Sequence, residues 1–308
     1  MSISKLKDDV PTGFDSPTAL PATPEQELQW QEANRTWWEL HPMRYDFSEK
    51  LEAEEFTREF YEEIDRRFFS DAATMISWNK LPFDSIINFG SLKKKDVLEI
   101  GCGNGSHAQL LAQRSRSYTG IDITRYAVRS TTQRLRYIGL NAVIEQMDAE
   151  KMSFPSESFD YIWSWGVIHH SANTRRILEE MHRVLRAKGE AQVMVYHRNF
   201  WNYQIFSGLL AGIFQGHLFK TGSLHKTSQK ITDGAIARYY TIAEWKSLVS
   251  DLFTVKDVTI LGSKAGLIPL PAGSLKSALI PLVPNSLSRF LTSRMKFGTF
   301  LVSTLEKK

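Results

Sequence analysis

The sequence predicts an α/β protein whose core is a doubly wound sheet, and three observations support this fold class. From Lys95 onward, short runs rich in β-branched and aromatic residues alternate with segments of helical periodicity. Strands separated by helices cannot pair as hairpins, so they are expected to be parallel and joined by right-handed crossovers. A glycine-rich turn directly follows the first of these runs. The chain has 308 residues, of which 42% are hydrophobic, enough for one large domain or for one domain plus a cap.

The N-terminal part has a different composition. Residues 1–22 contain three prolines and are expected to form a flexible leader. Residues 23–90 are expected to form an acidic helical cap, because residues 1–65 hold 16 Asp and Glu against 6 Lys and Arg. A helix with an acidic surface and an apolar stripe buries that stripe against another part of the protein, so the segment is expected to cover the rest of the molecule.

Two helices are predicted in this cap. The first begins at a capping box, Thr23 with Gln26, and continues toward Leu40. The second is expected from Glu49 to about Ser70, because apolar residues recur every fourth position and form one stripe.

Residues 91–308 are predicted to form the main domain, with a seven-stranded sheet that is parallel except for one antiparallel terminal strand. Two insertions interrupt it: an aromatic-rich lid insertion, residues 199–238, which is expected to be irregular, and a proline-punctuated insertion, residues 265–296. The expected strands are residues 97–100, 118–122, 142–147, 159–163, 191–196, 254–261 and 298–305. The expected helices are residues 105–114, 125–137 and 174–185, and one that begins at a capping box at Thr241.

The segment most indicative of function is the turn after the first strand. It contains Gly101, Cys102, Gly103, Asn104 and Gly105, and it leads from a buried strand into a helix. In such a turn the backbone approaches a ligand closely. The spacing is Gly-x-Gly-x-Gly, which differs from the Gly-x-Gly-x-x-Gly of dinucleotide-binding proteins, and the sequence has no P-loop.

With this turn, the sequence resembles the class I S-adenosylmethionine-dependent methyltransferases, over about residues 95–198. The resemblance implies a Rossmann-like fold with S-adenosylmethionine as cofactor, the glycine turn wrapping its methionine part. Glu99, two residues before the first glycine, would lie beneath the turn, and Asp122 would accept both ribose hydroxyls. Asp148 would bind the adenine amino group, with Ile123 and Met147 on either side of the ring. The implied cofactor-binding set also includes Ala149, Ser164 and Trp165.

Two adjacent histidines, His169 and His170, follow the fourth strand, where the resemblance implies that cofactor and acceptor meet. A neutral imidazole with an ordinary pKa near 6.5 suits removal of a proton from an acceptor hydroxyl, so either is a candidate catalytic base. A structural role at a helix start is the alternative. Because the side chains of two adjacent histidines point in different directions, no metal site is expected here. Cys102 is expected to be a small buried side chain rather than a nucleophile.

Aromatic and basic residues outside the strands are predicted to bind the acceptor. The candidates are Arg44, Tyr45, His197, Arg198, Arg238 and Tyr239. The three arginines would clamp a carboxylate or phosphate of the acceptor. Core packing is the alternative for the aromatic residues.

The predicted function is transfer of a methyl group from S-adenosylmethionine to an oxygen or nitrogen atom of a small-molecule acceptor. The alternatives are a membrane-associated lipid or quinone methyltransferase and a non-catalytic protein that binds the adenosyl cofactor. No nucleic-acid partner is expected, because the net charge of +4 is not concentrated in a basic, aromatic-interleaved patch. Residues 258–308 hold seven bases and one acid, so weak contact with an anionic membrane surface is expected only there. One cysteine and no secretory signal predict a cytoplasmic protein, and the oligomeric state stays open.

Overall fold

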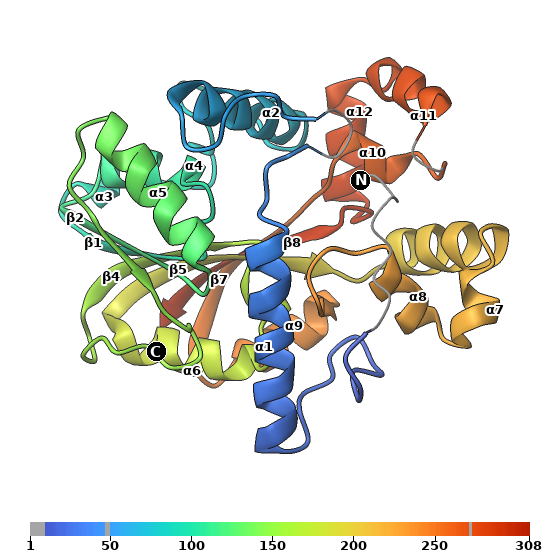
Figure 1. Cartoon of the computed structure of the whole chain (residues 1–308), viewed down its shortest axis with the longest axis horizontal. Coiled ribbons are helices and arrows are strands. Elements are labelled where there is room, and N and C mark those ends of the chain that lie inside the picture. Colours follow the sequence, from blue (N-terminus) through green and yellow to red (C-terminus); the bar gives the residue numbers. More distant parts are fainter. Residues whose placement is uncertain (1–9, 47–49, 271–272) are drawn as a thin grey trace.

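The computed structural model describes residues 10–46, 50–270 and 273–308. Its centre is one sheet with the strand order β3-β2-β1-β4-β5-β8-β7, and the two-residue β6 pairs with β5 (Figure 1). All neighbouring pairs are parallel except those of β8, which is antiparallel to β5 and β7. The predicted fold class is confirmed. The strands are β1 (Asp96–Ile100), β2 (Ser117–Asp122), β3 (Val143–Gln146), β4 (Phe159–Trp165), β5 (Leu185–His197), β6 (Tyr239–Tyr240), β7 (Phe253–Leu261) and β8 (Phe300–Lys307).

Helices cover both faces of the sheet, and each face has its own apolar core (Figure 1). On β4, Tyr161 and Trp163 belong to one core and Ile162 to the other, as the alternation of side chains along a strand requires. One core includes residues of α2 (Arg58–Met75), α4 (Ser106–Ala112) and α5 (Arg125–Tyr137). The other includes residues of α6 (Thr174–Val184) and α9 (Ile242–Val249). A four-residue helix, α3 (Phe89–Leu92), precedes β1.

The first N-terminal helix, α1 (Pro24–Leu40), begins where predicted, because the Thr23 side chain accepts a hydrogen bond from the Gln26 N–H. The prediction for the second helix was wrong at both ends. Helix α2 begins after Thr57, whose hydroxyl accepts from the Phe60 N–H, and it continues beyond Ser70 to Met75. Glu49, the expected start, lies outside the described residues.

The lid insertion is helical, so the expectation of an irregular segment was wrong. It contains the π-helix η2 (Phe200–Phe214), α7 (His217–Thr221) and α8 (Leu224–Lys230). A capping box between Asn199 and Asn202 starts η2, a signal that the sequence prediction missed. The second insertion holds α10 (Lys264–Leu267), α11 (Ser274–Leu279), η3 (Ile280–Leu282), α12 (Asn285–Arg289) and η4 (Phe290–Arg294). Within the described residues, none of the helices has the length and apolar character needed to cross a membrane.

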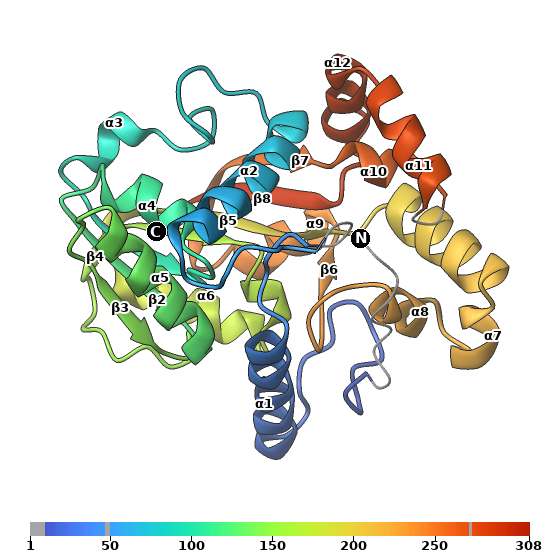
Figure 2. The same ribbon diagram turned by 45° about the horizontal axis from the view of Figure 1, so that its top comes forward.

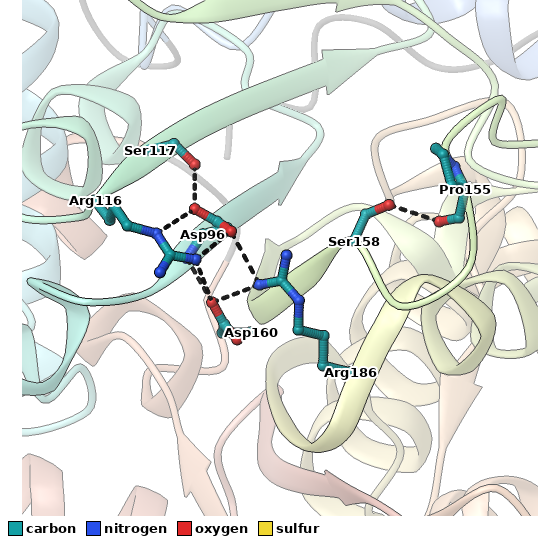
Figure 3. Close-up of polar contacts among 7 residues, drawn as sticks. All are labelled: Asp96, Arg116, Ser117, Pro155, Ser158, Asp160 and Arg186. Carbon is teal, nitrogen blue, oxygen red and sulfur yellow. Dashed lines mark hydrogen bonds and ion pairs between the residues drawn. The ribbon is translucent and has the colours of Figure 1, made fainter.

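A network of charged side chains joins the strands at the amino-end edge of the sheet (Figure 3). Arg186 donates to Asp96 over 2.9 Å and to Asp160 over 2.8 Å, and Arg116 donates to Asp96 over 2.8 Å. The hydrogen bond from Arg116 is the main cause of the lowered pKa of Asp96. Because β1 starts at Asp96 and ends at Ile100, this network lies at the opposite edge from the glycine turn.

Candidate functional site

The glycine turn after β1 has a conformation and surroundings that favour glycine. Gly101, Gly103 and Gly105 have φ angles of 79°, 53° and 79°, in the left-handed region. A Cβ atom on Gly101 would lie 2.2 Å from the Val167 side chain, so Gly101 cannot be replaced without displacing the segment after β4. At Gly103 no atom lies within 4 Å of such a Cβ position. The turn is therefore packed on one side and open at Gly103.

Two carboxylates lie beside this turn. Asp122, at the end of β2, is half-buried and accepts hydrogen bonds from the Gly103 N–H (3.2 Å) and from the N–H and hydroxyl of Thr124. Burial raises the pKa of Asp122. Glu99 is 2% exposed and accepts a hydrogen bond of 2.5 Å from the Tyr118 hydroxyl. Burial raises the pKa of Glu99 to about 8.

The segment after β3 lies at the same edge. Asp148 Oδ1 accepts hydrogen bonds from the Glu150 N–H (2.9 Å) and from the Gln31 side chain (2.8 Å). Ile123, Met147 and Ala149 are all half-buried. The structure thus brings the predicted residues from the ends of β1, β2 and β3 to one edge of the sheet.

Helix α1 is attached across this edge by contacts that the sequence prediction did not assign (Figure 2). The Gln31 side chain connects α1 to two segments at this edge, because it donates a hydrogen bond to Asp148 and accepts one from the Ala172 N–H (3.0 Å). Glu39 accepts from the N–H groups of Arg125 and Tyr126, the first residues of α5. Farther along, the Asn104 side chain donates to the Met43 carbonyl over 2.7 Å. Nothing in the local sequence of α1 signals partners more than 80 positions away.

The sequence prediction also missed Arg134 and Asp65, which hold the glycine turn in place. Arg134 is 2% exposed, donates to the Asn104 carbonyl over 2.8 Å and forms an ion pair with Asp65. Asp65, from α2, also accepts hydrogen bonds of 2.7 Å from Ser106 and Gln109. Cys102 is 4% exposed, and burial raises the pKa of its thiol well above the ordinary value. This surrounding fits the predicted role of Cys102 as a buried side chain better than nucleophilic catalysis.

The two histidines after β4 have different environments. His170 Nδ1 is 2.8 Å from the Ile236 carbonyl, and its ring packs edge-on against Trp38 of α1. His169 is fully buried, and neither ring nitrogen has a hydrogen-bond partner among the described residues. Burial lowers the pKa of His169 well below its ordinary value. An imidazole of such low basicity does not match the expected base with a pKa near 6.5.

Two residues that the sequence prediction missed adjoin His169. The Tyr196 ring, at the end of β5, lies 4.0 Å from the His169 ring, centroid to centroid. The Tyr196 hydroxyl donates to Asp233 over 2.7 Å. Gly234, the next residue, has a φ of 78°, and a Cβ there would lie 2.3 Å from His170. His170 therefore positions the loop that carries Asp233.

Most other predicted residues contact partners within the protein, whereas the buried Ser164 hydroxyl has no partner among the described residues. Ser164 is fully buried within β4, and Trp165 stacks on Trp163 at 5.3 Å. His197 is buried, with Nδ1 2.9 Å from the Gly298 carbonyl. Tyr45 stacks on Phe68 at 4.9 Å, and the Tyr239 hydroxyl is 2.5 Å from that of Thr232.

The three predicted clamp arginines do not converge on an open site. Arg44 pairs with Glu55 over 2.5 Å, and Arg198 pairs with Glu244. Arg238 is fully buried, and its guanidinium donates to the carbonyls of Ala19, Ser171 and Ala172. The prediction that Arg238 clamps an acceptor is corrected by this geometry, because its donors already join the N-terminal segment to the loop after η1 (Ile168–His170).

Comparisons with known proteins agree with this architecture. Residues 97–189 match the family model described as a methyltransferase domain. The chain is 38% identical over 97 residues to a phthiotriol/phenolphthiotriol dimycocerosates methyltransferase of Mycobacterium tuberculosis, which covers 31% of this chain and 35% of that protein. It is 35% identical over 103 residues to a phosphatidylethanolamine N-methyltransferase of Cereibacter sphaeroides, which covers 33% of this chain and 50% of that protein. The chain thus matches half or less of the length of each relative.

A solved structure of a candidate methyltransferase from Bacillus halodurans matches with a TM-score of 0.50 at 15% identity, over 73% of this chain and 98% of that chain. At this identity the likeness shows the fold alone. The glycine turn, Asp122 and Asp148 all fall within the matched residues 97–189. This part of the chain therefore matches a methyltransferase domain, and its curated relatives are methyltransferases.

Proposed function

We propose that the protein transfers the methyl group of S-adenosylmethionine to an oxygen or nitrogen atom of a small-molecule acceptor. The observation that carries the proposal is the pairing of Asp122 with Gly103. A half-buried carboxylate lies beside a glycine whose Cβ position is open, at the carboxyl edge of a methyltransferase domain. Open α/β sheets bind their ligands at this edge.

The residues at this edge fit the cofactor. Asp122 offers two acceptor oxygens, which suits the vicinal hydroxyls of a ribose. Asp148 would accept from the adenine amino group, and Ile123 and Met147 present half-buried apolar surface for the ring. The open position at Gly103 allows a close approach to the backbone of the turn.

When bound, the cofactor supplies a methyl group already activated by a sulfonium charge. The protein then has to align the acceptor and exclude water. Helix α1 suits the second task, because Gln31 and Glu39 attach it across the edge where the cofactor residues lie. An anion directly beside the sulfur would favour the ground state, so an aromatic acceptor side is preferable. Trp38, His169 and Tyr196 provide such a side.

On the acceptor side, we assign His169 a hydrogen bond to the acceptor, since its nitrogens have no partner among the described residues and its pKa is too low for a good base. The Tyr196–Asp233 hydrogen bond offers a route for the proton that leaves the acceptor. In this route Tyr196 takes the acceptor's proton as it passes its own proton to Asp233. His170 acts as a positioning residue for the loop that carries Asp233.

The names of the two curated relatives cover an alcohol and an amine acceptor, which supports an oxygen or nitrogen target without choosing between them. We further propose a reducing, cytoplasmic setting, because the single cysteine is buried and free.

Calorimetric titration of S-adenosylmethionine into the purified protein tests the proposal. Replacing Asp122→Asn is expected to weaken binding at least about 100-fold, because two hydrogen bonds to a charged group are worth about 1.5–3 kcal/mol each. Asp257→Asn, on the exposed surface of β7, serves as the matched control and should leave the affinity unchanged. No binding by the folded wild type would contradict the proposal. Binding without turnover on any acceptor would favour the non-catalytic alternative.

A further inference from the structure

Two segments of the chain have an unusual composition. Residues 199–232 and 264–296 together contain eight Lys and Arg and no Asp or Glu. By contrast, residues 1–65 are strongly acidic. The first segment is the lid insertion without residues 233–238, which include Asp233, and the second begins one residue before the second insertion. Neither segment contributes a strand to the sheet.

The structure joins these segments into one surface. The Trp201 indole N–H donates to the Gly266 carbonyl over 2.9 Å, and its ring stacks on Phe297 at 5.6 Å. The Lys276 ammonium lies 4.6 Å from the centroid of the Phe206 ring. In Figure 2 α11 lies near the yellow helix η2, and in both views the two helices are at the end of the molecule away from α3 and α5 (Figures 1 and 2).

This surface carries most of the exposed large apolar side chains. Among the described residues, 16 such side chains are exposed, and ten of them lie in the two segments. The most exposed are Phe219 at 79%, Phe214 at 74% and Leu282 at 73%. The ten are Phe200, Leu209, Ile213, Phe214, Phe219, Leu275, Leu282, Leu287, Phe290 and Met295. A concentration of this kind on a folded surface marks an interaction site rather than random exposure.

Lys226 is the one basic residue of this surface that has an ion pair among the described residues, with Asp15 over 2.9 Å. No ion pair within the described residues involves Arg289, Arg294 or Lys296, and Arg294 and Lys296 are exposed. Elsewhere on the molecule many arginines are paired, such as Arg67, Arg175 and Arg183. The exposed apolar side chains and the unpaired cationic side chains therefore lie in the same two segments, and neither segment contains a carboxylate.

We propose that this face, made by residues 199–232 and 264–296, docks on the surface of an anionic lipid bilayer. Aromatic and aliphatic side chains interleaved with Lys and Arg are the combination that inserts into the headgroup region of such a membrane. A second copy of the chain is a poorer occupant, because two faces of like charge repel each other. An acidic protein would satisfy the bases, but it is treated below as an outcome of the test.

The position of the face suits delivery of an amphiphilic acceptor, an extension that rests on the proposed methyl transfer. β5 ends at His197, one residue after Tyr196, and η2 begins three residues later at Phe200. A bilayer at this face would thus lie beside the edge of the sheet that carries Tyr196 and His169. The acceptor class would be a lipid with a hydroxyl or amine near its headgroup.

Cosedimentation of the full chain with vesicles tests the docking without cofactor or acceptor. Vesicles of phosphatidylcholine with about one third phosphatidylglycerol are compared with pure phosphatidylcholine at about 0.1 M and about 0.5 M salt. We expect binding to the anionic vesicles that falls at least tenfold at the higher salt, and much weaker binding to the neutral ones. Equal binding to both kinds of vesicle, or to neither, would overturn the proposal.

Variants locate the contact. Replacing Arg289, Arg294 and Lys296 together by Gln should weaken vesicle binding about 100-fold, because each base near the surface is worth about fivefold. Phe214→Ser with Phe219→Ser should weaken it at least tenfold. Ile138→Ser with Val143→Ser, exposed residues outside the two segments, is the matched control and should not change it.

Two further results separate this proposal from others. Self-association in the ultracentrifuge that the Phe214→Ser, Phe219→Ser variant abolishes, together with absent vesicle binding, would assign the face to a second copy. Binding of a polyglutamate peptide but not of anionic vesicles would assign it to an acidic protein. Because vesicle binding is measured without the cofactor, loss of cofactor affinity in Asp122→Asn leaves this test unaffected.

Discussion

At the scale of single residues, His169 combines full burial with two ring nitrogens that have no partner among the described residues. A buried polar group without a hydrogen bond costs about 1–3 kcal/mol, so the folded protein carries this cost for a reason other than stability. His170 is different, because its Nδ1 lies 2.8 Å from the Ile236 carbonyl. Removal of the His169 imidazole and removal of the His170 imidazole should therefore change the free energy of unfolding in opposite directions.

We predict that His169→Leu raises the free energy of unfolding at pH 7 by about 1–3 kcal/mol, while His170→Leu lowers it by a similar amount. The pH dependence gives a second readout. The pKa of His169 is lowered on folding, so the unfolded state takes up the proton more readily and the wild type loses stability as pH falls below the unfolded value near 6.5. The advantage of His169→Leu should grow by about 2 kcal/mol between pH 7 and pH 5. Urea unfolding at both pH values measures it, and a constant difference would contradict the assignment.

Residues that act within a few positions of each other were predictable from the sequence, and those that act across the fold were not. The glycine turn was predicted from the local sequence after a strand, whereas the role of Asp122, 19 positions later, was implied by the family resemblance; the structure places the two side by side. Arg238 shows the limit, since a sequence gives an arginine no mark of burial beneath three carbonyls. Asp233 was missed for the same reason, because its partner Tyr196 lies 37 positions earlier.

At the scale of elements, capping residues decided how well each helix could be predicted. The Thr23 cap located the start of α1, whereas apolar periodicity alone placed the second helix too early and missed the Thr57 cap. In the lid insertion, aromatic richness suggested irregular structure, although the Asn199–Asn202 capping box starts η2. Periodicity identifies a helical face, but a cap fixes where the backbone enters it.

Helix α1 offers an element-scale prediction. Gln31→Ala removes two hydrogen bonds, to Asp148 and from Ala172, worth about 0.5–1.5 kcal/mol each. We expect hydrogen exchange of α1 amides to accelerate about 10-fold to 100-fold, together with faster release of S-adenosylmethionine. Glu32→Ala is the matched control, because its partners Arg35 and Thr36 belong to α1 itself. Unchanged exchange in Gln31→Ala would mean that other contacts hold α1 in place.

At the scale of the whole molecule, charge and structure divide in the same way. The sheet supplies a rigid edge, the acidic N-terminal part provides a cover for it, and the basic insertions form the face beyond the end of β5. The charged network at Asp96 joins strands at the opposite, amino-end edge of the sheet (Figure 3). The chain thereby separates the proposed chemistry, its cover and the proposed membrane contact into adjoining parts.

This arrangement predicts how the molecule unfolds. Gln31, Glu39 and Asp65 connect α1 and α2 to the glycine turn, Asp148 and α5, so cap and sheet should melt in one cooperative transition. S-adenosylmethionine at about 100 times its Kd should stabilise the folded state by about 2.7 kcal/mol and raise the Tm by about 4 °C. Asp122→Asn should remove this shift at the same concentration. Calorimetry that resolved two transitions, with only one moved by the cofactor, would show that the cap folds independently of the site.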